Sequence, residues 1–488
     1  MNKAAQLTKI PTGIAGLDIA LEGGIPENRS MLVLGKSGTG KSFLLSEFIY
    51  RGITQHNQNG IIVSFEERTE DIINNVSSLG WNYQSLIDEK KLSIIDVSPL
   101  LGKQVHQTGD YDWMSGLLLR IKHRIKETDA KRISIDSIGM IISQNPQFEN
   151  SHKIRAAVFS FIESLKKMGL TIVFSSEIVE GNAVRYGIEE FVADGVIELE
   201  TLVGQNQIIR KLQIKKIRGT SYRSGKIIFE LSDKGIIAYP KIPIDTTTAI
   251  TSFDKRYKFG IAKLDEALNG GIPQGHMLLL GGNTGTGKTT LSLQFILDGL
   301  RNGENVLWVA LEEPIQQIKK TAASHGWDLE EFEEKGQLAF VSLSLVDIVP
   351  DKLLYQIINE SQSSKVTRVV FDSVSSLESA TMDKNSVREF LIQLTGYFKT
   401  KGITCLMTYL SADAFGASSA QLIGSLSSNE MRLSSIIDAI IILRYVERKQ
   451  SIAKLLNILK MRGTIHDKSI FQYEIEKSGF ELGERFDK

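Results

Sequence analysis

Residues 35–42 of this sequence read Gly35-Lys36-Ser37-Gly38-Thr39-Gly40-Lys41-Ser42, and residues 282–289 repeat the pattern as Gly282-Asn283-Thr284-Gly285-Thr286-Gly287-Lys288-Thr289. Both match G-x-x-x-x-G-K-[ST], a phosphate-binding loop in which backbone N–H groups surround phosphate oxygens, the lysine reaches the outer phosphates and the hydroxyl binds Mg²⁺. Each follows an apolar run, at residues 31–34 and 277–280, and precedes a helix-like stretch. Phosphate binding requires this strand–loop–helix context, so the sequence predicts two nucleotide sites.

The composition is that of an ordinary soluble globular protein with room for several domains. The 488 residues include 57 basic and 57 acidic ones, so the formal net charge is zero, which disfavours nucleic-acid binding. The single cysteine, Cys405, cannot form an internal disulfide, and its apolar surroundings indicate a buried strand in a reducing compartment. No apolar run approaches the roughly 18 residues that span a membrane, and no signal peptide is recognisable, so we expect a cytoplasmic protein.

The chain carries an internal duplication. Residues 12–18 recur as residues 259–265, and other landmarks follow in the same order. These landmarks are Phe65-Glu66-Glu67 with Leu311-Glu312-Glu313, Gly80-Trp81 with Gly326-Trp327, Ile135-Asp136-Ser137 with Phe371-Asp372-Ser373, and Ile217-Arg218-Gly219 with Met461-Arg462-Gly463. Since each copy is longer than any solenoid repeat, we expect two copies of one domain, at residues 1–244 and 245–488, joined near residues 240–252.

Each copy has the pattern of an α/β domain. Short β-branched runs such as residues 60–64 and 132–135 alternate with longer helical patterns, as at residues 153–168. This alternation predicts a mainly parallel twisted sheet flanked by helices on both faces. Residues 193–237 and 438–475 instead look like consecutive strands with little helix, so we expect each domain to end in antiparallel strands.

Acidic residues follow the apolar strands of each copy, where ATP chemistry needs a metal ligand and a group that orients the attacking oxygen. Asp136 and Asp372 end apolar strands, so they are candidate ligands of Mg²⁺. The alternative is that each aspartate only caps a helix. Acids such as the pairs Glu66-Glu67 and Glu312-Glu313 can be merely solvated, but recurrence in both copies favours catalysis, with the first of each pair as base. The predicted catalytic residues are Glu66, Glu67, Glu312 and Glu313, and the predicted metal ligands are Ser42, Asp136, Thr289, Glu312 and Asp372.

Two cations share one face of a strand in each copy, at Lys216-Ile217-Arg218 and Lys460-Met461-Arg462. If such a pair points away from its own domain, it can reach the γ-phosphate on a neighbouring subunit as an arginine finger, an interaction worth about 10³–10⁵ in rate. A head-to-tail interface of this kind closes into a ring; the alternative interpretation is a solvated edge strand protected by its charges. The seven histidines show no metal-ligand spacing, and His466 is a candidate nucleotide contact or strand-end residue.

These residues, in this order and twice over, resemble the KaiC family of circadian clock ATPases and autokinases, within the wider RecA/DnaB-like group. The resemblance covers nearly the whole chain and is most specific at residues 65–67, 135–137, 216–221 and 460–468. It implies two tandem RecA-like domains, bound ATP and Mg²⁺, and a double-ring hexamer whose first ring hydrolyses ATP slowly and whose second ring phosphorylates and dephosphorylates itself. The nucleotide contacts that it implies are Gly38, Thr39, Gly40, Lys41, Ser42, Phe43, Ser78, Lys216, Ile217, Arg218 and Thr220 in the first copy, and Gly285, Thr286, Gly287, Lys288, Thr289, Thr290, Lys454, Lys460, Met461, Arg462, Thr464, His466 and Lys468 in the second.

The resemblance also implies a pair of phosphoacceptors. In the family these are a Ser-Thr pair just before the strand that here begins near Ile436, so the matching positions are Ser434-Ser435. Their hydroxyls would accept the γ-phosphoryl group from ATP on the adjacent subunit, with Glu312 as base, and the added charge would change the packing of the ring. From the residues alone, Ser427-Ser428 are rival acceptors.

The first copy differs at this place. Aligning Asp194 with Asp438 puts Glu190-Phe191 where the second copy has Ser434-Ser435. We therefore expect the first loop to power hydrolysis and assembly, and the second loop to supply phosphate to the protein itself.

The sequence departs from the family pattern at three places. The second acceptor is Ser435 in place of Thr, and the threonine a few positions upstream is Asn429. The sequence also ends at Lys488, without the tail that binds the activator KaiA in cyanobacterial clock members. We therefore expect a homologue outside the standard three-component clock, acting in stress or signal timing, without KaiA and with room for a KaiB-like partner on the first ring.

Two other functions stay open. One is a RecA-like DNA motor, which the zero net charge and the sparse basic residues between Arg210 and Lys216 disfavour. The other is a nucleotide-gated scaffold whose kinase site is silent. DNA-stimulated ATP hydrolysis would favour the first, and ring assembly without phosphoserine would favour the second.

Overall fold

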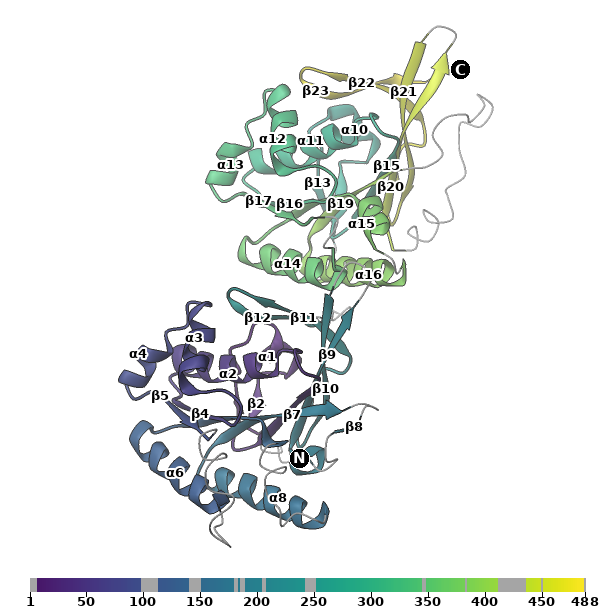
Figure 1. Ribbon diagram of the computed structural model, residues 1–488. Coiled ribbons are helices and arrows are strands. Elements are labelled where there is room, and N and C mark those ends of the chain that lie inside the picture. Colours follow the sequence, from purple (N-terminus) through teal and green to yellow (C-terminus); the bar gives the residue numbers. More distant parts are fainter. Residues whose placement is uncertain are drawn as a thin grey trace. The chain divides into compact units, whose positions relative to one another are not determined.

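Two compact units make up the protein, residues 1–241 and 242–488 (Figure 1). The computed structural model describes residues 7–97, 113–139, 151–179, 183–184, 189–203, 208–241, 252–344, 348–381, 384–410, 436–448 and 451–486. The units divide between Lys241 and Ile242, whereas the sequence suggested residue 244. Because residues 242–251 lie outside the described ranges, the position of the linker stays a prediction.

The first unit is built on one sheet with the strand order β12-β11-β10-β9-β3-β7-β6-β4-β5. Its strands are β3 (Ser30–Gly35), β4 (Gly60–Ser64), β5 (Leu92–Asp96), β6 (Arg132–Asp136), β7 (Thr171–Val179), β9 (Gly195–Val203), β10 (Ile208–Ile217), β11 (Lys226–Ser232) and β12 (Gly235–Tyr239), with β8 (Ala183–Val184) beside β7 and a separate pair, β1 (Lys9–Ile10) and β2 (Ile25–Pro26). In this order the strands from β9 to β5 are parallel, and β10, β11 and β12 are antiparallel to their neighbours. The prediction of a mainly parallel sheet that ends in antiparallel strands is confirmed.

The second unit has the same architecture, with the strand order β17-β16-β18-β19-β15-β20-β21-β22-β23. Its strands are β15 (Met277–Gly282), β16 (Val306–Ala310), β17 (Leu338–Ser342), β18 (Arg368–Asp372), β19 (Thr404–Leu410), β20 (Ala439–Arg448), β21 (Ser451–Met461), β22 (Ile470–Glu476) and β23 (Gly479–Arg485), with a separate pair, β13 (Ser252–Tyr257) and β14 (Ile272–Gln274). The strands from β17 to β20 are parallel, and β21, β22 and β23 follow antiparallel. The duplication in the sequence therefore corresponds to two copies of one fold.

Helices flank the sheet of each unit (Figure 1). Those of the first unit are α1 (Leu17–Ala20), α2 (Lys41–His56), α3 (Thr69–Ser77), α4 (Tyr83–Asp88), α6 (Trp113–Thr128), α8 (Ser151–Lys167) and α9 (Glu189–Val192). Those of the second are α10 (Ala262–Ala267), α11 (Lys288–Arg301), α12 (Ile315–Ser324), α13 (Glu330–Glu334), α14 (Pro350–Ser363), α15 (Val374–Ala380) and α16 (Lys384–Lys401). Within the described ranges, every helix falls short of the length or the apolar content that a membrane crossing requires.

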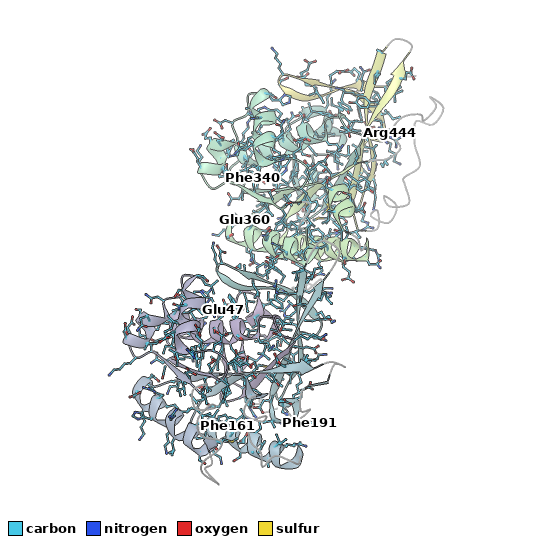
Figure 2. The ribbon with its side chains drawn as sticks, viewed as in Figure 1. Glu47, Phe161, Phe191, Phe340, Glu360 and Arg444 are labelled. Carbon is cyan, nitrogen blue, oxygen red and sulfur yellow. The ribbon has the colours of Figure 1, made fainter. Side chains whose placement is uncertain are left out.

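Buried apolar side chains fill the space on both faces of each sheet, because successive residues of a strand point to opposite sides. On β3, Met31 packs with residues of α2, α3 and α4, whereas Leu32 packs with residues of α6 and α8, among them Phe161 (Figure 2). Burial on two sides explains the continuous apolar runs of the central strands. In the second unit Cys405 of β19 is fully buried, and burial raises the pKa of its thiol, so the prediction of a core cysteine is confirmed.

Candidate nucleotide sites

The phosphate-binding loop and the predicted metal-binding aspartate lie at the same edge of each sheet. β3 ends at Gly35 and β15 at Gly282, where the phosphate-binding loops begin. The parallel strands β6 and β18 end at the same edge with Asp136 and Asp372. We call this edge the loop edge, and the other end of the same strands the opposite edge. Strands of this length separate the two edges by roughly 15–20 Å.

The first phosphate-binding loop joins β3 to α2, and glycines determine its path. Gly38 and Gly40 have φ angles of 76° and 101°, in the region that favours glycine. The ammonium group of Lys41 is buried and donates hydrogen bonds to the carbonyl oxygens of Gly35 and Lys36, at 3.0 and 2.9 Å. Burial lowers the pKa of Lys41, so an anionic ligand beside it would stabilise its charged form.

The second loop, between β15 and α11, has the same geometry. Gly285 and Gly287 have φ angles of 78° and 92°. Lys288 donates to the carbonyl oxygens of Gly282 and Asn283, at 2.9 and 3.0 Å, and burial lowers its pKa. The two loops therefore share their backbone path and the carbonyl contacts of the lysine.

A cavity of about 370 Å³ adjoins the first loop. Its described lining combines loop residues (Gly38, Gly40, Lys41, Ser42), carboxylates (Glu66, Glu67, Asp136, Glu177) and an apolar wall (Phe43, Ile72, Val76, Leu79, Leu231). Phe43 also packs against Trp81, with ring centroids 5.5 Å apart. A cationic loop, acids and an apolar wall together suit a nucleotide bound with a metal ion, whose base would lie against the apolar side chains.

Three carboxylates act on Lys41 in the first site: Glu177, Asp136 and Glu66. Asp136, at the end of β6, accepts a hydrogen bond from a serine hydroxyl on β7. Glu66 accepts one from the Ser137 hydroxyl, with the oxygens 3.3 Å apart. Burial raises the pKa of Glu66, and the charges of Asp136 and Glu177 raise it further. A carboxylate with a raised pKa is a stronger base, which is the role predicted for the first acid of the pair.

Glu67, the second acid of the first pair, is hydrogen-bonded to α3, which lines the cavity. The carboxylate of Glu67 accepts a hydrogen bond from Asn75 Nδ2 at 3.1 Å, and its backbone N–H donates to Ser64 Oγ at 3.0 Å. These contacts tie the end of β4 to α3. The geometry favours Glu66 over Glu67 as the base, and the roles of both stay predictions.

Glu177 is a site residue that sequence reasoning missed. It lies on β7 and pairs with Gly35, the last residue of β3. In the second unit Leu410 of β19 holds the same place and pairs with Gly282. The first site thus carries a carboxylate where the second carries a leucine. The available signal was a charged residue near the end of an apolar run, but the strand order that brings it beside the loop is not readable from the sequence.

In the second site Asp372 is 3% exposed and accepts a hydrogen bond from the Thr408 hydroxyl. Burial raises its pKa to about 6, and the charges of Glu312 and Glu313 contribute to the rise. The pKa of Glu313 is raised by burial and by the charge of Glu312. Among the neighbouring carboxylates, Glu312 has the largest electrostatic effect on the pKa of Lys288, which it raises. The two sites differ here, because the acid whose pKa is raised is the first of the pair, Glu66, in the first site and the second of the pair, Glu313, in the second. The role of Glu312 as the base stays a prediction.

Both acid clusters fit a divalent cation held jointly with phosphates. Carboxylates that raise one another's pKa values repel, and a cation beside them would relieve this repulsion. Ser42 and Thr289 directly follow the loop lysines, where the loop pattern expects a hydroxyl for Mg²⁺, and Ser42 lines the first cavity. Among the described residues, no group of three or more His, Cys, Asp or Glu side chains could hold a metal ion by itself. This pattern suits Mg²⁺, which binds one or two carboxylates together with substrate phosphates and water.

The cation pair of the first unit lies at the opposite edge of its own sheet. Ile217, between the two cations, pairs with Gly195 of β9, and Gly195 pairs with Met31 near the start of β3. The phosphate-binding loop begins after Gly35, at the other end of β3. The pair is therefore too far from its own loop to contact the same phosphates, and a role in nucleotide binding requires another subunit.

Both cations of this pair bind the short helix α9. Lys216 donates to the backbone carbonyl of Glu190, and Arg218 donates to that of Phe191 at 3.3 Å; the Phe191 side chain is exposed (Figure 2). Arg218 lies just past the end of β10, and a bulge after Ile214 shifts the register of that strand. The side chains of Lys216 and Arg218 nevertheless lie on the same side of the chain, since both reach carbonyl oxygens of α9.

The second unit repeats this placement. Met461 pairs with the first residue of β20, which lies beside the start of β15. Lys460 donates to the carbonyl oxygen of Ile437 at 2.7 Å, and Arg462 forms an ion pair with Asp438 at 3.5 Å. These cations, too, lie at the edge opposite their own loop.

The other contacts that the resemblance implies are spread over both edges. At the opposite edge, the Thr464 hydroxyl accepts a hydrogen bond from Arg256 at 2.8 Å. Lys454 instead lies at the loop edge, because its partner Tyr445 on β20 comes after Leu443, the residue that pairs with Gly282. Of the remaining residues, Ile217 is buried between its two cations, Thr39 and Thr286 are buried in the loops, Thr290 lies on α11, Ser78 follows α3, and Thr220, His466 and Lys468 follow the cation pairs. The acceptor candidates Ser434-Ser435, their rivals Ser427-Ser428, and Asn429 lie outside the described residues.

Comparison with known proteins gives concordant matches over nearly the whole chain. The family model described as "ATPase: KaiC" matches residues 10–242 and 257–486. The circadian clock oscillator protein KaiC of Thermostichus vulcanus is 37% identical over 486 residues, which cover 99% of this chain and 90% of that protein. The protein of the same name from Prochlorococcus marinus subsp. pastoris is 37% identical over 483 residues, which cover 99% of this chain and 92% of that one.

Proposed function

Because the chain belongs to the KaiC family of ATPases, we propose that it forms a double-ring hexamer whose first ring hydrolyses ATP and whose second ring transfers phosphate from ATP to Ser434 or Ser435. Membership of this family implies an enzyme that binds ATP. The ring, the use of Mg²⁺ and the serine kinase activity are the further content of the proposal. We place the protein in circadian-type timing or signalling, as the names of its relatives suggest.

The proposal of a ring rests on the position of the cation pairs. Each unit has its phosphate-binding loop at one edge of the sheet and its Lys and Arg pair at the opposite edge. Subunits that join these two edges meet head to tail, and such an interface closes into a ring when the rotation between subunits permits. An arginine supplied by the neighbour then stabilises the charge of the γ-phosphoryl group.

Transfer to Ser434 or Ser435 fits the same geometry. Ser435 directly precedes Ile436, with which the described chain resumes, and Lys460 binds the carbonyl oxygen of the next residue, Ile437. This part of the chain is therefore held at the opposite edge of the second sheet. We propose that the serine before it accepts phosphate from ATP on a neighbouring subunit instead of its own.

In the proposed transfer, Lys288 and the N–H groups of its loop bind the phosphates, and Glu312 takes the proton of the serine hydroxyl. The serine oxygen attacks the γ-phosphorus, the bond from that phosphorus to the bridging β-phosphate oxygen breaks, and ADP leaves. Thr289 and Asp372 would hold Mg²⁺, which would supply neutralisation of the phosphate charge. In the first ring Glu66 orients a water molecule in place of the serine.

Replacing Glu177 with glutamine is expected to slow ATP hydrolysis by the first ring about tenfold while ATP still binds. The charge of Glu177 raises the pKa of Glu66, so its removal leaves a weaker base for the attacking water. Steady-state hydrolysis and ATP binding measure the effect. Leu410→Gln, at the corresponding place in the second unit, is the matched control and should leave hydrolysis by the first ring unchanged. Equal rates for Glu177→Gln and wild type would contradict this role.

Mass spectrometry of the purified protein after incubation with Mg²⁺ and ATP tests the proposed function. We expect hexamers in which Ser434 or Ser435 carries phosphate. Hexamers that bind ATP but lack phosphoserine would support the scaffold alternative, and hydrolysis that requires DNA would support the DNA motor. Either result would refute the kinase proposal.

A further inference from the structure

The β11–β12 hairpin forms one side of the first nucleotide cavity. Leu231, near the end of β11, lines that cavity, and its Cδ2 atom lies 3.4 Å from the position that a Cβ on Gly40 would occupy. The hairpin is therefore packed directly on the phosphate-binding loop. A movement of the hairpin would change the space that the nucleotide occupies.

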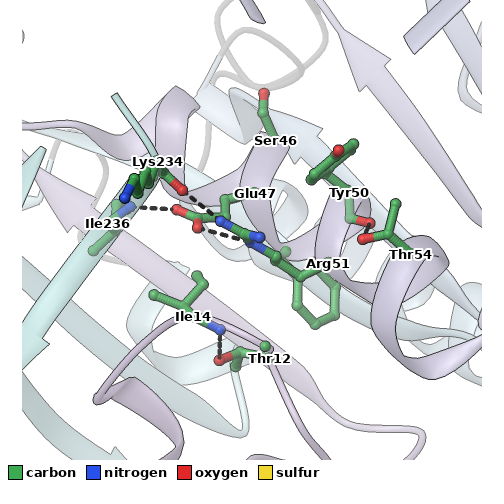
Figure 3. Close-up of polar contacts among 12 residues, drawn as sticks. Thr12, Ile14, Ser46, Glu47, Tyr50, Arg51, Thr54, Lys234 and Ile236 are labelled. Atoms are coloured by element: carbon green, nitrogen blue, oxygen red, sulfur yellow. Dashed lines mark hydrogen bonds and ion pairs between the residues drawn. The ribbon is translucent and has the colours of Figure 1, made fainter. Parts of the chain in front are cut away.

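One buried carboxylate ties this hairpin to α2, the helix that starts at the loop lysine (Figure 3). Glu47 Oε2 accepts a hydrogen bond from the backbone N–H of Ile236 at 2.7 Å, and Oε1 accepts one from Arg51 Nε at 3.2 Å. Arg51 also donates to the carbonyl oxygen of Lys234 at 2.5 Å. Gly235 has a φ of 119°, and a Cβ there would lie 2.2 Å from Glu47 Oε1, so only glycine fits. We call this set of contacts the hairpin clamp.

The second unit has a neutral version of the hairpin clamp. Gln294 on α11 takes the place of Glu47: its Oε1 accepts from the Phe480 N–H at 2.7 Å, and its Nε2 donates to the Phe480 carbonyl oxygen at 3.4 Å. Gly479 is again the glycine of close approach, since a Cβ there would lie 3.0 Å from Gln294 Cδ. Ile475 of β22 packs on the second loop as Leu231 packs on the first.

We propose that Glu47 and Gln294 are positioning residues that hold the last hairpin of each unit on the helix of its phosphate-binding loop, and that the Glu47 clamp, unlike the Gln294 clamp, loosens as the pH rises to neutrality. The clamp itself does not depend on what the site does with ATP. Its effect on the nucleotide rests on the proposed function.

Burial dominates the electrostatics of Glu47. The residue is 1% exposed, and burial raises the pKa of its carboxyl group from 4.5 to about 7, while the Ile236 N–H and Arg51 act in the opposite direction. Tyr83 of α4 also faces this group, and its own pKa is raised by burial and by the charge of Glu47. Lys234 contacts the clamp through its carbonyl oxygen, and the residue is exposed. The net effect of these surroundings is to favour the protonated form.

The sign of the pH effect follows from the raised pKa. When the hairpin leaves α2, Glu47 meets water and its pKa returns towards 4.5, so the closed hairpin holds the proton more tightly than the open one. Closure is therefore most favourable below about pH 4.5, weakens as the pH rises to about 7 and is constant above that. Within this window the opening constant rises roughly tenfold per pH unit. Gln294 does not titrate, so the second hairpin shows no such change.

Hydrogen exchange on the full-length protein tests the hairpin clamp. After correction for the pH dependence of intrinsic exchange, protection of residues 231–239 should fall about tenfold or more between about pH 5.5 and 7, while that of residues 475–482 stays level. With Glu47→Gln, the protection of the first hairpin should no longer change with pH. With Gln294→Glu, the protection of the second hairpin should fall as the pH rises. Level protection of the first hairpin in wild type, or an equal fall in Glu47→Gln, would overturn the proposal.

Arg51→Gln separates the charge of the clamp from a general loss of structure. Because Arg51 lowers the pKa of Glu47 in the closed hairpin, its loss should extend the fall in protection to higher pH, while the fall still begins near the pKa of the open state. Low protection at every pH in Arg51→Gln would instead show that Arg51 holds the hairpin regardless of Glu47, against the proposal.

ATP affinity connects the hairpin clamp to the nucleotide. In a Lys288→Ala background, which confines binding to the first unit, the affinity should fall about threefold or more between about pH 6 and 8, relative to the same protein with Glu47→Gln. If hydrogen exchange follows the clamp while the affinity matches that of Glu47→Gln at both pH values, the positioning role is overturned and the ATPase proposal stands. If ATP does not bind at either pH, the proposed function fails and hydrogen exchange alone decides on the clamp.

Discussion

Replacing Arg218 with alanine is expected to slow ATP hydrolysis by the first ring at least about 10³-fold. Arg218 lies past the end of β10, at the edge of its sheet opposite the phosphate-binding loop, so the variant leaves the loop of the same chain intact. In the proposed ring, the variant removes the guanidinium that a neighbouring subunit would supply to the γ-phosphoryl group. The hydrolysis rate per site at saturating ATP, on rings whose assembly has been verified by mass, measures the change.

Lys215→Ala is the matched control for this variant. Lys215 lies on β10, shortly before Arg218, and forms an exposed ion pair with Glu198 at 2.8 Å, so its loss should change hydrolysis less than about twofold. Mixed rings of Arg218→Ala and Lys41→Ala subunits should regain part of the activity, because some interfaces then combine an intact loop with an intact arginine. Wild-type hydrolysis by Arg218→Ala, or no recovery in mixed rings, would contradict action between subunits.

Replacing Glu312 with glutamine is expected to lower the rate of phosphate incorporation into the second unit by about 10²–10⁴. Glu312 follows β16, and among the carboxylates its charge has the largest effect on Lys288, so it lies beside the lysine that is proposed to bind the phosphates. Glutamine keeps the shape of the side chain but cannot take a proton. The phosphorylated fraction of the peptide that contains Ser434-Ser435, followed over time, measures the rate.

Two further variants identify the base. Glu66→Gln, the matched change in the first unit, should slow hydrolysis there and leave phosphorylation of the second unit in place. Glu313→Gln tests the choice within the pair and should have the smaller effect on phosphorylation. If Glu312→Gln incorporates phosphate at the wild-type rate, Glu312 is not the base.

The sequence was sufficient to predict the architecture and the loop edge of each site. The glycine spacing of the loops, the apolar runs around them and the acids that end β6 and β18 are local patterns, and parallel strands bring their carboxyl ends to one edge. The duplication gave each pattern a second instance. Recurrence therefore favoured a catalytic role for Glu66-Glu67 and Glu312-Glu313 over simple solvation, and that role stays a prediction.

Features that depend on strand order could not be predicted in this way. Glu177 becomes a site residue only because β7 lies beside β3, which is a property of the sheet and not of the residues around Glu177. The two edges of the sheet likewise place Arg218 far from its own loop, whereas the sequence shows only that a long stretch of chain separates them. Glu47 looks like a surface residue of an amphipathic helix, and its burial becomes visible only when the β11–β12 hairpin covers it.

The claim that phosphate passes between subunits is tested most directly by mass spectrometry of mixed rings. Subunits labelled with ¹⁵N carry Lys288→Ala and have no donor site in the second unit, whereas unlabelled subunits carry Ser434→Ala and Ser435→Ala and have no acceptor. After incubation with Mg²⁺ and ATP, we expect phosphoserine in the labelled peptide that contains Ser434 and Ser435, and none in labelled subunits incubated alone. Labelled subunits that stay unphosphorylated in verified mixed rings, under conditions in which wild-type rings are phosphorylated, would contradict transfer between subunits.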